Sequence, residues 1–108
     1  MLNTGPAKKL TIYMDESYKI NGKPAYEVLL DIFYKRKISG ASVFRGIEGY
    51  GSTRVFHTAK ILELSTTLPV KIEVVDTQLK IDEILLEITP IVHKGLITVG
   101  DTVVVKNS

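Results

Sequence analysis

Hydrophobic positions repeat along this chain with a period of two in some segments and of three to four in others, so strands and helices can be distinguished. Alternation of apolar and polar residues predicts strands that bury one face. The predicted strands are residues 10–15, 41–47, 70–74, 96–99 and 102–106. Gly100-Asp101 is interpreted as a turn or bulge between the last two. In the second strand, Val43 and Ile47 share one face and Phe44 lies on the other.

Two segments have the period of a helix with one apolar stripe. The first is residues 24–38, where Pro24 fits the first turn and Gly40 fits the C′ position after the helix end. The second is residues 77–92, capped by Asp76 or Thr77. Pro90 predicts a kink or an early end there, because it lacks the N–H for a helical hydrogen bond. Residues 59–64 fit either a strand or a helix.

The resulting order, β-α-β-β-α-β, predicts an α+β, ferredoxin-like fold whose antiparallel sheet carries both helices on one face. The length of 108 residues fits a single domain spanning 1–108. No helix is left to cover the opposite face of the sheet. The pattern nevertheless assigns to that face Phe44, Val75, Val103 and Val105. An exposed apolar face favours self-association.

Composition and charge narrow the classes of function. Hydrophobic residues make up 44% and charged residues 24%, which is a globular balance, and the net charge of +2 is too small to argue for nucleic acid or membranes. Cysteine is absent, which excludes disulfides and thiolate chemistry. Met1 to Lys9 lacks the apolar segment of a signal peptide, and no apolar run is long enough to span a bilayer. We therefore expect a cytoplasmic protein.

The segment from Arg45 to Lys60 is the strongest candidate for a functional loop, because it combines three glycines within six residues with three cations and a histidine. Cationic side chains donate to phosphates, and glycines let backbone N–H groups approach the same oxygens. The candidate ligand-binding residues are therefore Arg45, Gly49, Gly51, Arg54, His57 and Lys60. The alternative is a glycine-rich hairpin end with solvated charges, and the residues alone leave both interpretations open.

Other chemistries find less support in the sequence. A hydrolase would use His57 with Ser52 or Thr53, and Glu48 or Glu63 could supply the carboxylate that orients the imidazole. Nothing in the sequence sets the geometry of these residues, so we expect no enzyme. His57 and His93 without cysteines make a weak ligand set, so no metal is expected. The segment Glu48-Gly49-Tyr50-Gly51-Ser52 resembles an RNA-recognition motif but begins with an acid and ends without an aromatic residue. An RNA-binding ferredoxin-like module is therefore a weaker alternative, and we expect no nucleic-acid partner.

Three segments resemble the PII signalling proteins: Gly40-Ala41-Ser42-Val43, Gly49-Tyr50-Gly51 and Leu68-Pro69-Val70-Lys71-Ile72-Glu73. Nearly the whole chain is similar to a PII-like family, domain of unknown function 190. The matching segments include Gly22-Lys23-Pro24, Tyr26-Glu27, Arg45-Gly46-Ile47 and His57-Thr58-Ala59-Lys60-Ile61-Leu62. Taken together in this order, the segments indicate the family more specifically than any single segment does.

The resemblance implies a homotrimer with a site for an adenine nucleotide between protomers. It also implies a loop, here at about 49–60, that regulates a protein partner, for which a membrane transporter is one candidate. Two departures from PII concern the phosphate contacts. Ser52-Thr53 stands where PII has Arg-Gln, and Leu96 stands where PII has a lysine. The resemblance therefore supports the fold and the trimer more strongly than it supports ATP binding. A structural or protein-binding homotrimer without a metabolite site is the alternative.

Overall fold

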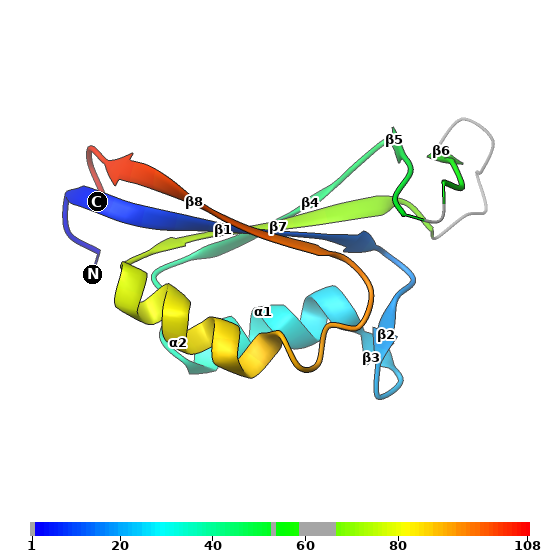
Figure 1. Ribbon diagram of the computed structural model, residues 1–108, viewed down its shortest axis with the longest axis horizontal. Coiled ribbons are helices and arrows are strands. Elements are labelled where there is room, and N and C mark those ends of the chain that lie inside the picture. Colours follow the sequence, from blue (N-terminus) through cyan, green and yellow to red (C-terminus); the bar gives the residue numbers. More distant parts are fainter. Residues whose placement is uncertain (1, 53, 59–66) are drawn as a thin grey trace.

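The computed structural model describes residues 2–52, 54–58 and 67–108. Its main layer is a four-stranded antiparallel sheet in the order β4-β7-β1-β8, and both helices lie on one face of that sheet (Figure 1). The elements are β1 (Gly5–Asp15), β2 (Lys19–Ile20), β3 (Lys23–Pro24), α1 (Ala25–Lys35), β4 (Ala41–Arg45), β5 (Glu48–Gly49), β6 (His57–Thr58), β7 (Pro69–Asp76), α2 (Gln78–Ile88) and β8 (Leu96–Val104). The predicted α+β fold, with an antiparallel sheet and two helices, is confirmed.

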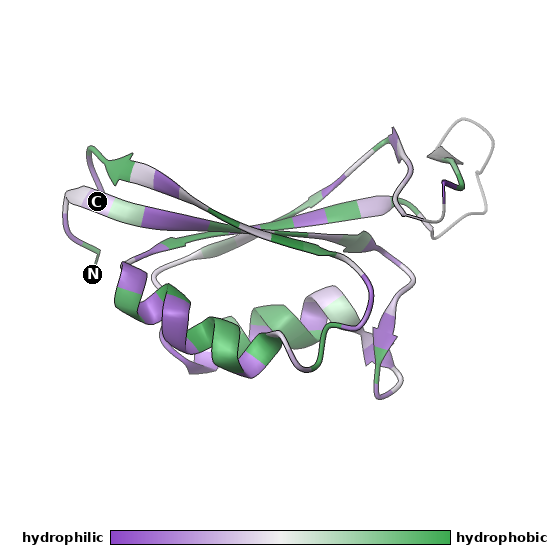
Figure 2. Ribbon diagram, in the orientation of Figure 1, coloured by the Kyte–Doolittle hydropathy of each residue, from purple (hydrophilic) through white to green (hydrophobic). Residues whose placement is uncertain are grey.

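The core lies between the sheet and the helices. Alternate residues of the two central strands point toward the helices, and every third or fourth helical residue points back. Figure 2 shows hydrophobic residues in the middle of the sheet and along both helices, and hydrophilic residues at the β2–β3 hairpin. The buried core residues are Leu10, Ile12, Met14, Ala25, Leu29, Phe33, Val70, Ile72, Val74, Ile81, Ile84 and Ile88.

α1 ends earlier than the sequence pattern predicts. The helix stops at Lys35, and Lys37 adopts the left-handed conformation, with φ of 59°, directly after the capping residue. The Lys37 N–H donates to the carbonyl of Tyr34 and the Ile38 N–H donates to that of Phe33, which is the Schellman arrangement. The prediction that Gly40 would take the C′ position is therefore wrong, because Lys37 already terminates the helix.

α2 starts at a cap made by two neighbouring side chains. Thr77 Oγ1 accepts from the backbone N–H of Lys80 at 3.2 Å, which confirms Thr77 as the capping residue. The buried carboxylate of Asp76 accepts from the backbone N–H groups of Thr77 at 2.7 Å and Ser39 at 2.8 Å. Asp76 thereby links the helix start to the segment that leads into β4. The helix ends at Ile88, so the early end predicted from Pro90 is confirmed.

β8 is continuous where a turn was predicted. It pairs with β1 without interruption from Leu96, opposite Tyr13, to Val104, opposite Gly5. Gly100 and Asp101 lie within this ladder, and Asp101 forms an ion pair with Lys8. The predicted turn or bulge at Gly100-Asp101 and a separate strand over 102–106 are therefore wrong, because residue-by-residue pairing with β1 holds these residues extended to Val104.

The face of the sheet away from the helices carries one row of three apolar side chains and a lysine, and beside it a charged cluster that shares this lysine. The strand registers align Phe44, Lys71, Tyr13 and Leu96 across the four strands. In the next rows, Glu73 lies 3.0 Å from Lys71 and 3.2 Å from Lys9, measured between charged atoms. Hydrogen bonds from Lys71 and then Lys9 lower the pKa of Glu73 below its ordinary value. This outer face is therefore partly apolar and partly charged.

Three side-chain placements from the pattern need correction. Val75 and Phe44 lie on the outer face as predicted, but Val103 pairs with Pro6 and so lies on the helix side of the sheet. Val105 follows the end of β8 and belongs to neither face. Ile47 also lies outside its strand, since β4 ends at Arg45. The outer face consequently carries fewer valines than the sequence suggested.

Candidate functional site

Two glycines fix how the chain leaves the sheet after β4. The Gly46 N–H donates to the carbonyl oxygen of Pro69 at 2.6 Å, and a Cβ added to Gly46 would lie 2.8 Å from Pro69 Cγ. A Cβ added to Gly49 would lie 3.2 Å from the same atom. Only glycine lets the backbone pass this close to the first residue of β7. The contact with Pro69 therefore positions the candidate loop at one end of the sheet.

Beyond this contact the chain forms a small hairpin from β5 and β6. Glu48 pairs with Thr58, and Gly49 pairs with His57. At its end the Arg54 N–H donates to the carbonyl of Gly51 at 2.8 Å, and Arg54 adopts a positive φ of 61°. The structure thus brings together in one hairpin the backbones of Gly49, Gly51, Arg54 and His57, which the sequence had proposed as one site.

An aromatic pair occupies the same hairpin. The rings of Tyr50 and Phe56 lie 4.8 Å apart between centroids, and the Arg54 guanidinium carbon lies 5.6 Å from the Tyr50 centroid. All three side chains are exposed. No sequence pattern singled out this aromatic pair. The available signal was that Tyr50 lies between two glycines of the glycine-rich stretch and Phe56 follows six residues later.

Arg45 already has a carboxylate partner. Its Nη2 and Nε donate to Glu16 Oε1 at 3.0 and 3.2 Å. Arg45 pairs with Val70 in the sheet, which places its side chain on the helix side. Glu16 is held in turn by its N–H, which donates to the carbonyl of Leu68 at 2.8 Å. An anionic ligand that used Arg45 would have to compete with Glu16, a residue that no local sequence pattern singled out.

The remaining candidates are described only in part. The backbone of His57 lies in β6, opposite Gly49. Lys60 lies outside the described residues, and so does Thr53, one of the two residues considered for a hydrolase. Within the described ranges, no group of three or more His, Asp or Glu side chains is placed to hold a metal ion. In the same ranges no helix is both long and apolar enough to cross a membrane.

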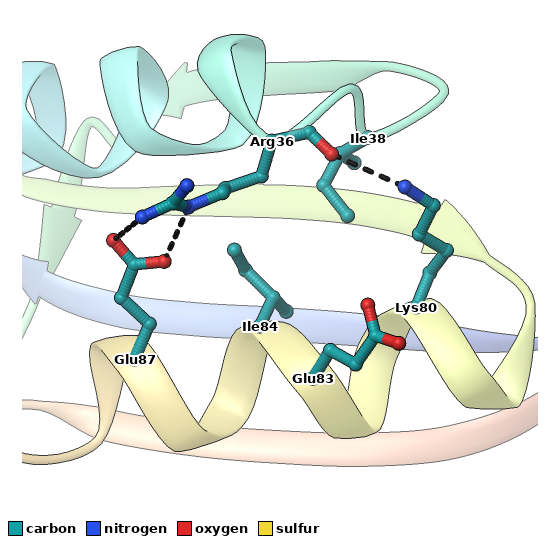
Figure 3. Close-up of a pocket in the computed structure, with 6 residues that line it drawn as sticks. All are labelled: Arg36, Ile38, Lys80, Glu83, Ile84 and Glu87. Carbon is teal, nitrogen blue, oxygen red and sulfur yellow. Dashed lines mark hydrogen bonds and ion pairs between the residues drawn. The ribbon is translucent and has the colours of Figure 1, made fainter.

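A hollow lies on the helix layer, away from the hairpin. It has a volume of about 210 Å³, and Figure 3 shows the side chains that line it. Glu87 accepts from Arg36 at 2.7 and 3.3 Å, and Lys80 Nζ donates to the Arg36 carbonyl at 3.2 Å (Figure 3). The hydrogen bond and charge of Glu87 raise the pKa of Arg36. These contacts connect the end of α1 to α2 across the hollow. Because Arg36 and Lys80 already have partners within the protein, the hollow makes a poor ligand site.

Residues 7–104 match the DUF190 family, which is described as an uncharacterized ACR. The chain belongs to this family. Among its relatives, a UPF0166 protein of Aquifex aeolicus is 41% identical over 98 residues, covering 91% of this chain and 92% of that protein. A UPF0166 protein of Methanocaldococcus jannaschii is 39% identical over 101 residues, covering 93% of each chain. The family resemblance predicted from the sequence is confirmed.

A solved structure identifies the fold of this DUF190 protein as PII-like. CPII, a nitrogen regulatory PII-like protein from Thiomonas intermedia K12, superposes with a TM-score of 0.72 at 18% identity. The match covers 98% of this chain and 94% of CPII, which was solved bound to ADP, AMP and bicarbonate. At this identity the similarity establishes the fold, and the predicted PII-like, ferredoxin-like architecture is confirmed.

Proposed function

We propose that this DUF190 protein is a cytoplasmic, non-enzymatic regulatory protein, built as one PII-like domain, that binds an adenine nucleotide between the protomers of a homotrimer. The observation that carries the proposal is the fold shared with CPII, a nitrogen regulatory protein whose structure holds ADP and AMP. The ligand would order the loop at about 49–60, and the ordered loop would regulate a protein partner. A membrane transporter is one candidate for that partner.

The hairpin geometry supports a phosphate site at this end of the sheet. Arg54 and the backbone of Gly49 and Gly51 lie in one hairpin, where N–H groups and a guanidinium can meet the same anion. Arg45 would join them by exchanging Glu16 for a phosphate oxygen. His57 and Lys60 complete the proposed set from their sequence positions.

The outer face of the sheet supports the trimer. Tyr13, Phe44 and Leu96 lie in one row of the sheet and remain 46%, 47% and 57% exposed. Three copies that turn these faces toward a common axis would remove this row from water, and closed symmetry would leave no copy of it exposed. Light scattering should then give about three times the 12.0 kDa mass of one chain. A monomer at every concentration would contradict the trimer.

The test of nucleotide binding is a thermal-shift screen with ATP, ADP, AMP, cyclic mononucleotides and cyclic dinucleotides. A ligand at a hundredfold excess over its Kd stabilises the folded protein by roughly 2.7 kcal/mol, which raises Tm by roughly 10 °C or more for a domain of this size. Replacing Arg45 or Arg54 with Ala should reduce the shift. Glu16→Gln should increase it, because the neutral amide leaves Arg45 free for the phosphate. Lys19→Ala, an exposed cation on β2, is the matched control and should change nothing.

The main alternative, a structural or protein-binding homotrimer without a metabolite site, makes a different prediction. No nucleotide would then shift Tm, and a variant lacking the loop would still bind the cellular partner. That pair of results would reject the sensor and leave the structural trimer. Nucleotide turnover in the same preparation would instead contradict the assignment as a non-enzyme.

A further inference from the structure

The β5–β6 hairpin and Ile47, the residue directly before it, carry a group of four exposed apolar side chains. Ile47 is 79% exposed, Phe56 67%, and Tyr50 and Val55 are each 55% exposed. Figure 1 shows this hairpin at one end of the sheet, away from both helices. Single exposed apolar residues are ordinary, but four within ten residues of one hairpin indicate a contact surface.

The packing within the hairpin leaves these side chains available to a partner. The Tyr50 ring contacts the Phe56 ring at a centroid distance of 4.8 Å and an interplanar angle of 55°. This tilted pair holds the two rings together and leaves most of Phe56 in water. The Arg54 guanidinium lies beside the Tyr50 ring, which keeps a cation next to the apolar group.

The charge and shape of the hairpin favour a lipid bilayer over a protein as its partner. The segment 45–60 contains the cations Arg45, Arg54 and Lys60 and one carboxylate, Glu48. Arg45 is paired with Glu16, so Arg54 is the cation placed beside the exposed rings. A pair of aromatic rings, two aliphatic side chains and the adjacent Arg54 match the region between lipid headgroups and acyl chains, where aromatic rings are enriched and cations meet phosphates. A bilayer also accepts a projecting hairpin without needing a complementary groove, whereas a protein partner would need one.

We propose that the β5–β6 hairpin docks on an anionic membrane surface, with Ile47, Tyr50, Val55 and Phe56 entering the headgroup region and Arg54 meeting lipid phosphates. This inference goes beyond the proposed function and does not depend on nucleotide binding. Docking would bring the loop to the plane of the membrane, where a membrane-embedded partner could contact it.

The experiment is flotation of the full chain with vesicles of phosphatidylcholine alone and of phosphatidylcholine mixed with phosphatidylglycerol, at low salt and without nucleotide. The protein should float with the anionic vesicles and much less with the neutral ones. Phe56→Ser and Ile47→Ser should each lower binding about tenfold, because each removes an apolar side chain that would enter the interface. Arg54→Gln should lower it about fivefold on anionic vesicles only.

Leu86→Ser is the matched control, since Leu86 is 81% exposed but lies on α2. It should float as the unchanged protein does, and circular dichroism should show all variants folded. The proposal is overturned if the unchanged protein does not float with anionic vesicles. It is equally overturned if the Phe56→Ser and Ile47→Ser variants bind anionic vesicles as well as the unchanged protein does. It is also overturned if Phe56→Ser lowers the mass measured by light scattering, because the hairpin would then be a contact between copies.

Discussion

Replacing Gly46 with alanine tests whether the contact with Pro69 holds the candidate site in place. The new Cβ would lie 2.8 Å from Pro69 Cγ and 3.2 Å from the Pro69 carbonyl oxygen. Neither atom can rotate away, because one belongs to a closed ring and the other to the backbone of β7. The end of β4 would have to move by several tenths of an ångström, which weakens the 2.6 Å hydrogen bond from the Gly46 N–H.

The expected cost combines two effects. Overpacking against rigid atoms costs about 1–3 kcal/mol, and loss of the hydrogen bond costs about 0.5–1.5 kcal/mol. Alanine also lowers the conformational entropy of the unfolded chain, which stabilises the folded protein by about 0.4–1 kcal/mol and offsets part of this cost. We therefore expect Gly46→Ala to destabilise the protein by about 2 kcal/mol, or roughly 10 °C in Tm for a domain of this size.

Urea unfolding followed by circular dichroism measures this difference at fixed protein concentration. Gly51→Ala is the control, because a Cβ there meets nothing within 4 Å, and its stability should stay equal or rise slightly. Combining Gly46→Ala with Pro69→Ala removes the closest contact atom, so the double variant should lose less than the sum of the two single variants. A Gly46→Ala protein within about 0.5 kcal/mol of the original would refute the argument.

Three further predictions concern the scaffold. Lys37→Gly should stabilise the protein by about 1 kcal/mol in urea unfolding, because glycine adopts the left-handed conformation without the strain of a side chain. Asp76→Ala should destabilise it by about 3 kcal/mol, since two backbone N–H groups would lose their acceptor, and Asp76→Asn should cost less. Folding lowers the pKa of Glu73, so its contribution to stability is complete at a pH above the ordinary pKa of the residue. That contribution is lost as pH falls through the lowered pKa of the folded protein. Glu73→Gln should therefore flatten the acid limb of a curve of stability against pH.

Each of these has a result that contradicts it. A less stable Lys37→Gly protein would mean that the lysine side chain contributes more than the backbone strain costs. An Asp76→Ala protein of unchanged stability would mean that water replaces the carboxylate at Ser39 and Thr77. Identical acid limbs for Glu73→Gln and the original protein would mean that the ion pairs with Lys9 and Lys71 are solvated in solution.

The sequence predicted the elements better than their ends. Residues 10–15 and 70–74 alternate strictly, and both lie in central strands whose inner residues are buried. The end of α1 was misplaced because Gly40 is the conventional stop signal, whereas hydrogen bonding and packing force Lys37 into that role. The turn at Gly100-Asp101 was misplaced for a related reason: turn-forming residues stay extended when a neighbouring strand pairs with them.

The sequence by itself determined the period of each segment, the family and the gathering of glycines and cations in residues 45–60, because these are local or cumulative properties of the chain. The tertiary structure decided which groups meet. Glu16, the residue directly after β1, pairs with Arg45; Pro69 fixes the position of Gly46; and the register turns Val103 toward the helix side. Such contacts depend on strand order and register, which join residues that no local pattern connects.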